Sequence, residues 1–241
     1  MGKDTFDVLI LIGRPASGKS EIIDFLKHTA PDVRRGRYHI AGLDILGVFP
    51  MLWAWFEEDR ILNQQLGHPR LYTDEGCYFK HPAYWHLLIE CLSLDYQKRQ
   101  RDNPAYHDHT TALVEFLRGS EHGGYGEAFS HLADGLLQKA AIVYVNVSFA
   151  ESLCKNRRRF NPQRPDSILE HGLSDEKMER LYREDDWAAL APVESGFVRV
   201  RDISVPFAVF ENEDDVTTDK PDLLAARLET VLDKLWNLRQ G

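Results

Sequence analysis

The sequence has few cysteines, no long apolar run and no excess of basic residues, and each shortage excludes a class of protein. Its three cysteines, Cys77, Cys91 and Cys154, are widely spaced and form no CxxC pair, so we expect neither a disulfide framework nor a cysteine-based zinc site. No apolar run approaches the length that spans a bilayer. The formal net charge of −9 argues against general nucleic-acid binding, which relies on many lysines and arginines facing phosphates.

The remaining composition is that of a folded, soluble protein. With 241 residues, 43% hydrophobic and 28% charged, the chain is long enough for one large α/β domain with a substantial core. Its first four residues lead directly into an apolar segment and leave no room for a signal peptide, so we expect a cytoplasmic protein. The composition does not define an oligomeric state.

An eight-residue segment after the apolar run 8–12 carries the most specific signal. It fills every fixed position of the phosphate-loop pattern GxxxxGK[ST] with Gly13, Arg14, Pro15, Ala16, Ser17, Gly18, Lys19 and Ser20. Glycines at both ends let successive backbone N–H groups turn inward around a polyphosphate, and a following helix adds its free N-terminal amides. Lys19 supplies positive charge to the terminal phosphates, and the Ser20 hydroxyl is placed to bind Mg²⁺. We therefore expect a nucleoside triphosphate with Mg²⁺ at residues 13–20.

Five apolar runs predict strands, at 6–12, 38–43, 111–117, 141–147 and 205–210. They do not alternate cleanly with polar residues, as is typical of strands covered by helices on both faces. Helical patterns separate the runs, so the sequence predicts a doubly wound α/β fold with a mainly parallel five-stranded sheet. Ligands of such sheets bind beyond the carboxyl ends of the strands.

The segment 49–103, between the second and third predicted strands, is longer than an ordinary crossover. Most of its residues favour helices, and we expect a helical insertion that covers an acceptor site. Four aromatic residues in it are candidates for stacking on a base or a sugar, although helical spacing favours packing. They are Trp53, Trp55, Tyr84 and Trp85.

This layout resembles the P-loop kinases of nucleosides, nucleotides and other small metabolites. The shared features are the phosphate loop after the first strand, a helical insertion after the second, and an arginine-rich segment after the fourth. The resemblance covers most of the chain, and the phosphate loop is its one highly specific motif. It implies a single P-loop domain over residues 1–241, ATP and Mg²⁺ as cofactors, and transfer of the γ-phosphate to a small-molecule acceptor.

The resemblance also implies roles for two carboxylates and an arginine. Asp44, expected just after the second strand, would hold the acceptor or accept its hydroxyl proton; alternatively, it caps the turn beginning at Ile45. Glu115 lies in a predicted buried strand, where a carboxylate is costly without a partner or a cation, and would orient Mg²⁺ or its water. Arg118 would bind substrate beside Glu115, although the two are adjacent in nucleoside kinases and three residues apart here. A structural pairing of Glu115 with a surface arginine is the alternative.

Residues 155–187 occupy the place of the mobile lid in these kinases. Guanidinium groups on a closing loop neutralise charge on the phosphoryl group during transfer. Arg157, Arg158 and Arg159 cannot all face one way on a helix, and we favour Arg157 and Arg158 as phosphate ligands. Arg164 is a further candidate, and the other arginines would be solvated or complement the helix C-terminus.

Two other functions stay open at this point. A GTP switch would use Asp44-Ile45-Leu46-Gly47 as its DxxG and the segment 212–215 as its NKxD, but Glu213 replaces the lysine and Asp44 follows the second strand. A partner-stimulated NTPase would use Glu115 to orient water. The segment 107–109, with two histidines and an aspartate, looks like a metal-ligand cluster, but its position before the third strand is typical of a polar turn.

Overall fold

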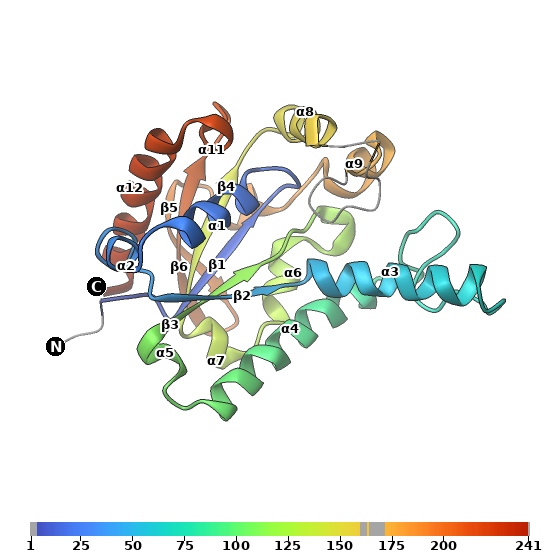
Figure 1. The fold of residues 1–241 in the computed structure, drawn as a ribbon, viewed down its shortest axis with the longest axis horizontal. Coiled ribbons are helices and arrows are strands. Elements are labelled where there is room, and N and C mark those ends of the chain that lie inside the picture. Colours follow the sequence, from blue (N-terminus) through green and yellow to red (C-terminus); the bar gives the residue numbers. More distant parts are fainter. Residues whose placement is uncertain (1–3, 160–162, 164–171, 241) are drawn as a thin grey trace.

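A six-stranded sheet forms the centre of the computed structural model, which describes residues 4–159, 163 and 172–240 (Figure 1). Its strand order is β2-β3-β1-β4-β6-β5, and every neighbouring pair is parallel except β5 with β6. The strands are β1 Val8–Gly13, β2 Gly42–Gly47, β3 Thr110–Glu115, β4 Ala140–Asn146, β5 Ser195–Val200 and β6 Ile203–Glu211. The predicted doubly wound, mainly parallel α/β sheet is confirmed, with one strand more than expected.

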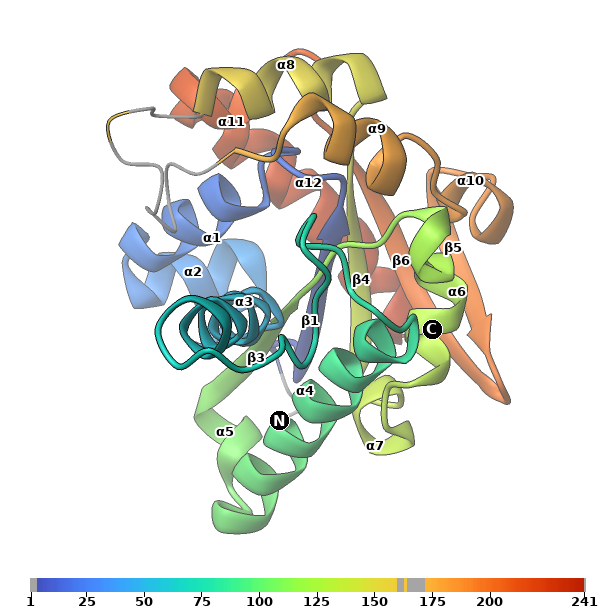
Figure 2. The ribbon, with the colours of Figure 1, turned by 90° about the vertical axis from the view of Figure 1, so that its right-hand side faces the viewer.

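Helices cover both faces of this sheet. They are α1 Lys19–His28, α2 Pro31–Tyr38, α3 Phe49–Gln64, α4 Ala83–Asp102, α5 Tyr106–His109, α6 Gly124–Ser130, α7 Asp134–Leu137, α8 Phe149–Arg159, α9 Asp175–Tyr182, α10 Trp187–Leu190, α11 Val216–Asp219 and α12 Pro221–Gln240, with a 3-10 turn η1 at Ser120–His122. Figure 2 shows α8 and α9 beyond one end of the sheet.

The central strand β1 divides the core into two layers. Alternate residues of a strand point to opposite faces. Val8, Ile10 and Ile12 pack with α4, α6 and α7, whereas Leu9 and Leu11 pack with α1, α2 and α12. Because β1 is buried on both sides, its carboxyl end fixes the loop that follows it between two rigid layers.

The second strand begins four residues later than predicted, at Gly42 and not at residue 38. Tyr38 instead ends α2, and its side chain is buried with Ile40 in the α1 and α12 layer. Tyr38 and Ile40 therefore contribute to the core from the end of a helix and from the segment that connects it to β2. An apolar run in the sequence does not distinguish such residues from a strand.

The antiparallel strand β5 was not predicted from the sequence. It forms a hairpin with β6 in which Val198 and Val200 are buried while Phe197 is exposed. The turn places Arg201 in the left-handed region at φ 54°, a conformation usually given to glycine or asparagine. Arg201 is held there by bonds from its guanidinium to the Ser130 and Leu132 carbonyls, so a tertiary contact replaces the usual sequence signal.

The segment between β2 and β3 is helical, as expected. Its first helix, α3, projects beyond the sheet (Figure 1). The next helix, α4, packs against the sheet. The buried Asp59 carboxylate holds the loop after α3 by accepting bonds from the N–H groups of residues 71–73 and from the Thr73 hydroxyl. In the part of the chain that the structure describes, no helix is long and apolar enough to cross a membrane.

Candidate active site

The loop between β1 and α1 has the geometry that its two glycines allow. Gly13 has φ 152°, and a Cβ there would lie 2.5 Å from the Val145 carbonyl oxygen. Gly18 has φ 110°, and a Cβ would lie 2.5 Å from Asn212 Nδ2 and 2.6 Å from Thr217 Oγ1. Both positions therefore require glycine for backbone conformation and for space.

Lys19, the first residue of α1, lies folded over this loop. Its Nζ donates to the Arg14 carbonyl at 2.8 Å and to the Gly13 carbonyl at 3.1 Å. The residue is only 4% exposed, and burial lowers the pKa of its ammonium group to about 8, although the Glu115 carboxylate opposes the shift. The loop therefore holds a cation that the protein alone solvates poorly. Ser20, the next residue, is exposed on the first turn of α1.

Glu115 ends β3 at the same edge of the sheet. It pairs in register with Leu11 of β1 and Gly47 of β2. Burial raises the pKa of its carboxyl group, and the nearby charges of Lys19 and then Arg159 act against this shift. Arg159 in turn lowers the pKa of Lys19. Thus Lys19, Glu115 and Arg159, from three separate elements, lie within electrostatic reach of one another.

The position of Arg159 follows from the face that α8 turns to the loop. Ser152 Oγ donates to the Pro15 carbonyl at 2.7 Å, and Lys155 is buried beside it. Residues spaced by three, four and seven positions share a helix face, so Arg159 extends the face of Ser152 and Lys155. Arg158, three residues after Lys155, also meets this spacing, and Arg159 is distinguished by the effect of its charge on the pKa values of Lys19 and Glu115.

Arg157 and Arg158, the arginines favoured from the sequence, are both exposed on α8. Arg157 forms an ion pair with Asp175 at 2.6 Å, and Arg158 forms ion pairs with Glu151 and Asp215. Arg159, by contrast, is half-buried, and its charge affects the pKa values of Lys19 and Glu115. The preference for Arg157 and Arg158 as phosphate ligands stays a prediction. Arg164 and one third of the expected lid, residues 160–162 and 164–171, lie outside the described residues.

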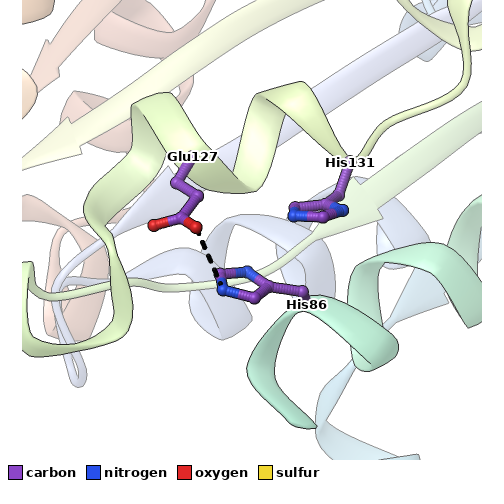
Figure 3. A group of neighbouring side chains, drawn as sticks. All are labelled: His86, Glu127 and His131. Carbon is purple, nitrogen blue, oxygen red and sulfur yellow. Dashed lines mark ion pairs between the residues drawn. The ribbon is translucent and has the colours of Figure 1, made fainter. Parts of the chain in front are cut away.

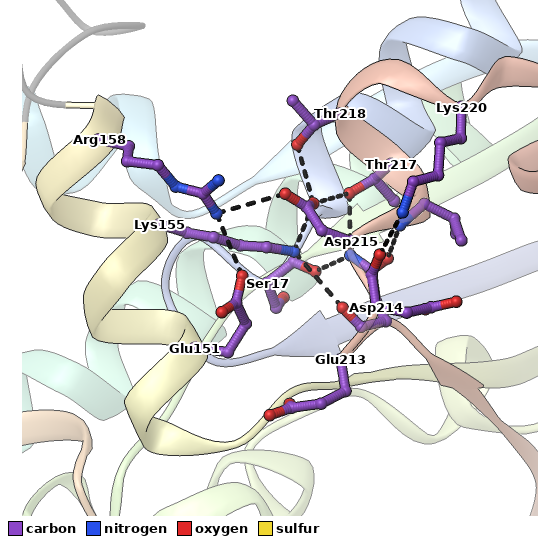
Figure 4. A network of polar contacts seen from close by, with 12 residues as sticks. Ser17, Glu151, Lys155, Arg158, Glu213, Asp214, Asp215, Thr217, Thr218 and Lys220 are labelled. Atoms are coloured by element: carbon purple, nitrogen blue, oxygen red, sulfur yellow. Dashed lines mark hydrogen bonds and ion pairs between the residues drawn. The ribbon is translucent and has the colours of Figure 1, made fainter.

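The segment after β6 contacts both the phosphate loop and α8 (Figure 4). Asn212 Nδ2 donates to the Ser17 carbonyl at 2.7 Å and to Thr217 Oγ1 at 2.8 Å. Asp215 forms an ion pair with Lys155 at 2.7 Å, and its carboxylate also accepts from Thr218. Since the carboxylate that would read a guanine base is engaged in these contacts, the segment 212–215 does not have the arrangement that the GTP-switch hypothesis requires.

Asp44 lies inside β2, not after it as expected. It pairs with Ala112, three residues before the pair of Gly47 with Glu115, which places it roughly 10 Å from the carboxyl edge. Its carboxylate accepts from Arg99 Nη1 at 2.7 Å and from the Tyr106 hydroxyl at 2.6 Å. The prediction of its position was wrong, because β2 begins later than the apolar run suggested, and the contacts give Asp44 a role in joining β2 to α4.

Arg118, three residues after Glu115, is buried. Its terminal nitrogens donate to the Leu117 and Trp85 carbonyls, and its guanidinium lies over the Trp85 and Phe116 rings. Burial lowers the pKa of Arg118 to about 10. The alternative of a surface arginine paired with Glu115 is therefore wrong for this residue, which is 1% exposed.

Arg14, within the phosphate loop, has side-chain partners outside the loop. It forms an ion pair with Asp185 at 2.9 Å and donates to the Val147 carbonyl. Arg14 thus connects the loop to the segment that follows α9, a role that the GxxxxGK[ST] pattern does not specify.

Other residues that the sequence drew attention to have structural partners. Trp55 stacks on Tyr72, and Trp85 stacks on His122 with ring centroids 3.9 Å apart. His107, from the expected polar turn, bonds to the Tyr96 hydroxyl at 2.9 Å in the short helix α5. Packing explains these tryptophans and this histidine.

Comparison with known proteins supports the fold. No protein-family model and no curated protein matches the sequence. The structure of Kti12 from Chaetomium thermophilum in complex with ADP-AlF3 matches over 97% of this chain and 100% of that chain, with a TM-score of 0.53 and 12% identity. Shikimate kinase from Acinetobacter baumannii matches over 96% of each chain, with a TM-score of 0.46 and 12% identity. The likeness to Kti12 therefore supports the mainly parallel α/β fold described above, in which the phosphate loop follows the first strand.

Proposed function

We propose that this protein transfers the γ-phosphoryl group of ATP, together with Mg²⁺, to a small-molecule acceptor. The observation that carries this proposal is the geometry of the phosphate loop, in which Gly13 and Gly18 leave no space for a Cβ and the buried Lys19 lies against the loop carbonyls. Glu115 and Arg159 lie within electrostatic reach of that lysine. Phosphoryl transfer asks a protein mainly to position the reactants and to neutralise charge. One ammonium, one carboxylate and one guanidinium beside inward-turned amides are suited to both tasks.

Each group has a distinct role in this proposal. The N–H groups of residues 13–20 and Lys19 would bind the phosphates, and the Ser20 hydroxyl and Glu115 would hold the magnesium ion. The donor set fits this ion, since Mg²⁺ takes oxygen ligands and usually one or two carboxylates. Mg²⁺ supplies charge neutralisation when bound, and burial of Glu115 favours a cation partner. Arg159 would stabilise the negative charge on the transferred group.

We further propose that the insertion 49–103 covers the acceptor and that residues 155–187 act as a lid. The chain passes directly from the edge that carries Glu115 into α3, since Val48 N donates to the Glu115 carbonyl. Asp44 and Arg118 are not included among the acceptor ligands, because both are engaged in contacts that stabilise the core.

The test is a screen of nucleosides, nucleotides, sugars and other metabolites with ATP and Mg²⁺, scored by the mass of the phosphorylated product. We expect product with one class of acceptor, and no product from Lys19→Ala that circular dichroism shows to be folded. Full activity in folded Lys19→Ala, or the absence of any phosphorylated product together with the absence of ATP binding, would reject the proposal.

A partner-stimulated NTPase is the second candidate, and the shape of the insertion favours it. Ile61, Leu66 and Leu71, at the far end of α3 and in the loop beyond it, are 40% to 60% exposed, and projecting apolar side chains suit contact with another protein. Kti12, which shares the fold, was solved with ADP-AlF3. ATP hydrolysis that needs a protein and no acceptor would favour this candidate over the kinase.

A further inference from the structure

Two histidines and two glutamates meet between α4 and α6, in the helical layer on the other side of the sheet from α1. Figure 3 shows three of them, His86, Glu127 and His131. His86 and Glu90 lie one turn apart on α4, and Glu127 and His131 lie one turn apart on α6 and just after it. Residues four apart share one face of a helix. Two such His/Glu pairs therefore face each other across the helix interface.

We propose that His86, Glu127 and His131 bind a divalent transition-metal ion, with Zn²⁺ as the ion that suits them best. One ligand atom from each of the three residues lies within 4.8 Å of the other two. The His86 Nε2 and Glu127 Oε1 atoms are already 3.1 Å apart. Zinc–nitrogen and zinc–oxygen bonds of about 2.0 to 2.2 Å place tetrahedral ligand atoms roughly 3.3 to 3.5 Å apart, so rotation of these exposed or half-buried side chains would complete the site.

The proton arrangement at His131 favours metal binding. Its Nδ1 lies 2.9 Å from Glu90 Oε1, so this nitrogen carries the proton that the carboxylate accepts. The lone pair of Nε2 is then available to a cation, as in the carboxylate–histidine–metal arrangement that orients ligands in zinc proteins. Glu90 is thus a positioning residue for His131.

His86 faces Glu127 with its Nε2 atom, so Nε2 is the nitrogen that would bind the ion. The other ring nitrogen, Nδ1, is buried and has no hydrogen-bond partner among the described residues, and metal binding at Nε2 leaves it unpaired. The His86 and His131 rings stack with their centroids 4.5 Å apart. The two imidazoles are therefore adjacent, and the binding of one ion by both requires the rings to turn out of this stack until their in-plane lone pairs converge on the ion.

The donor set determines the class of ion. Two imidazoles and one carboxylate suit Zn²⁺ and neighbouring first-row metals, whereas Mg²⁺ and Ca²⁺ prefer sites made of oxygen atoms alone. Three protein ligands leave a fourth position for water. A cavity of about 490 Å³, lined in part by Glu90, His131 and Arg201, borders the cluster and gives an ion a route from solvent. Bound metal would link α4 of the insertion to α6, a property that does not depend on the proposed kinase activity.

The experiment is titration of chelator-treated protein with Zn²⁺, followed by calorimetry and by competition with a chromophoric chelator. We expect one ion per chain with a dissociation constant of about 1 µM or tighter, which corresponds to a binding free energy of about −8 kcal/mol or stronger. His86→Ala and His131→Ala should each weaken binding by about 100-fold or more. Glu90→Gln should weaken it by about 10- to 100-fold, because it releases the orientation of His131.

His28→Ala is the matched control. His28 forms an exposed pair with Asp24 at the same i,i+4 spacing on α1, and its loss should leave the affinity unchanged. At a zinc concentration about 100-fold above the dissociation constant, we expect the melting temperature of the native protein to rise by about 5 to 10 °C, and that of the two histidine variants to stay constant. Absence of binding overturns the proposal, as does binding that survives in both histidine variants. If an alanine variant fails to fold, Glu127→Gln decides the question in the same way.

Discussion

The buried ammonium group of Lys19 predicts that nucleotide affinity depends on pH in a specific direction. Without nucleotide, burial holds the pKa of Lys19 near 8, against a normal value of 10.5. Bound phosphates would replace the Gly13 and Arg14 carbonyls as its partners and raise this pKa again, since nearby negative charge favours the protonated form. Binding therefore takes up a proton above pH 8, and affinity should fall as the pH rises through that value.

The size of the effect follows from the fraction of free protein that already carries the charge. About nine-tenths of Lys19 is protonated at pH 7 and about one-tenth at pH 9. If the protonated form binds the phosphates, the dissociation constant of the Mg²⁺–ADP complex should be nearly constant below pH 7.5. It should then rise about tenfold between pH 7 and pH 9, equal to about 1.4 kcal/mol.

Isothermal titration calorimetry with ADP and Mg²⁺ at pH 7, 8 and 9 measures this directly, and ADP avoids turnover. Buffers of different ionisation enthalpy should reveal proton uptake at pH 9. Lys19→Ala should bind more weakly with little change over the same range, whereas Lys234→Ala, which removes an exposed lysine of α12, should keep the native profile. A dissociation constant that stays constant to pH 9 in the native protein, or an equal rise in Lys19→Ala, would refute the reasoning.

Three further substitutions test the site and its supports. Arg159→Ala should lower the rate of phosphoryl transfer by about 100-fold or more. Arg157→Ala removes an exposed ion pair and should change this rate by less than about threefold. Equal rates in the two variants would contradict the placement of Arg159. Gly18→Ala should bind nucleotide about tenfold or more weakly, because the new Cβ would overlap neighbouring side chains and because residue 18 has a positive φ. Gly36 has open space around it, so Gly36→Ala should bind normally in the same titration. Asp59→Ala leaves three loop N–H groups without their acceptor and should destabilise the protein by about 2 to 4 kcal/mol in urea denaturation; a loss below about 0.5 kcal/mol would show that water satisfies these groups.

The features that the sequence predicted well are those whose physics is local. The phosphate loop follows from glycines at fixed spacing, and the loop geometry shows why Gly13 and Gly18 cannot carry a Cβ. The apolar runs identified five of the strands, because strands buried on both faces need continuous apolar sequence. These predictions require no knowledge of which distant segments meet.

The features that the sequence missed depend on distant contacts. The left-handed turn at Arg201 is held by carbonyls some seventy residues earlier in the chain, so β5 has no local turn signal. The start of β2 depends on the burial of Tyr38 beneath α12, and a shift of four residues moved Asp44 from the expected edge into the strand. The metal-ligand group between α4 and α6 joins positions that lie about forty residues apart in the sequence, whereas the histidines that looked like ligands in sequence, near residue 107, lie in a short helix.

The packing of α8 gives the three arginines at its end different surroundings, although their side chains are the same. Composition treats them alike, but α8 is fixed to the phosphate loop by Ser152 on the Pro15 carbonyl and by Lys155 on Asp215. Those two contacts define the face that turns toward the loop, and Arg159, seven residues after Ser152 and four after Lys155, extends that face. The segment after β6 positions the same loop through Asn212 and the same helix through Asp215. The orientation of Arg159 and the shape of the loop therefore depend on one buried network, and loss of the Lys155 ion pair should disturb both together.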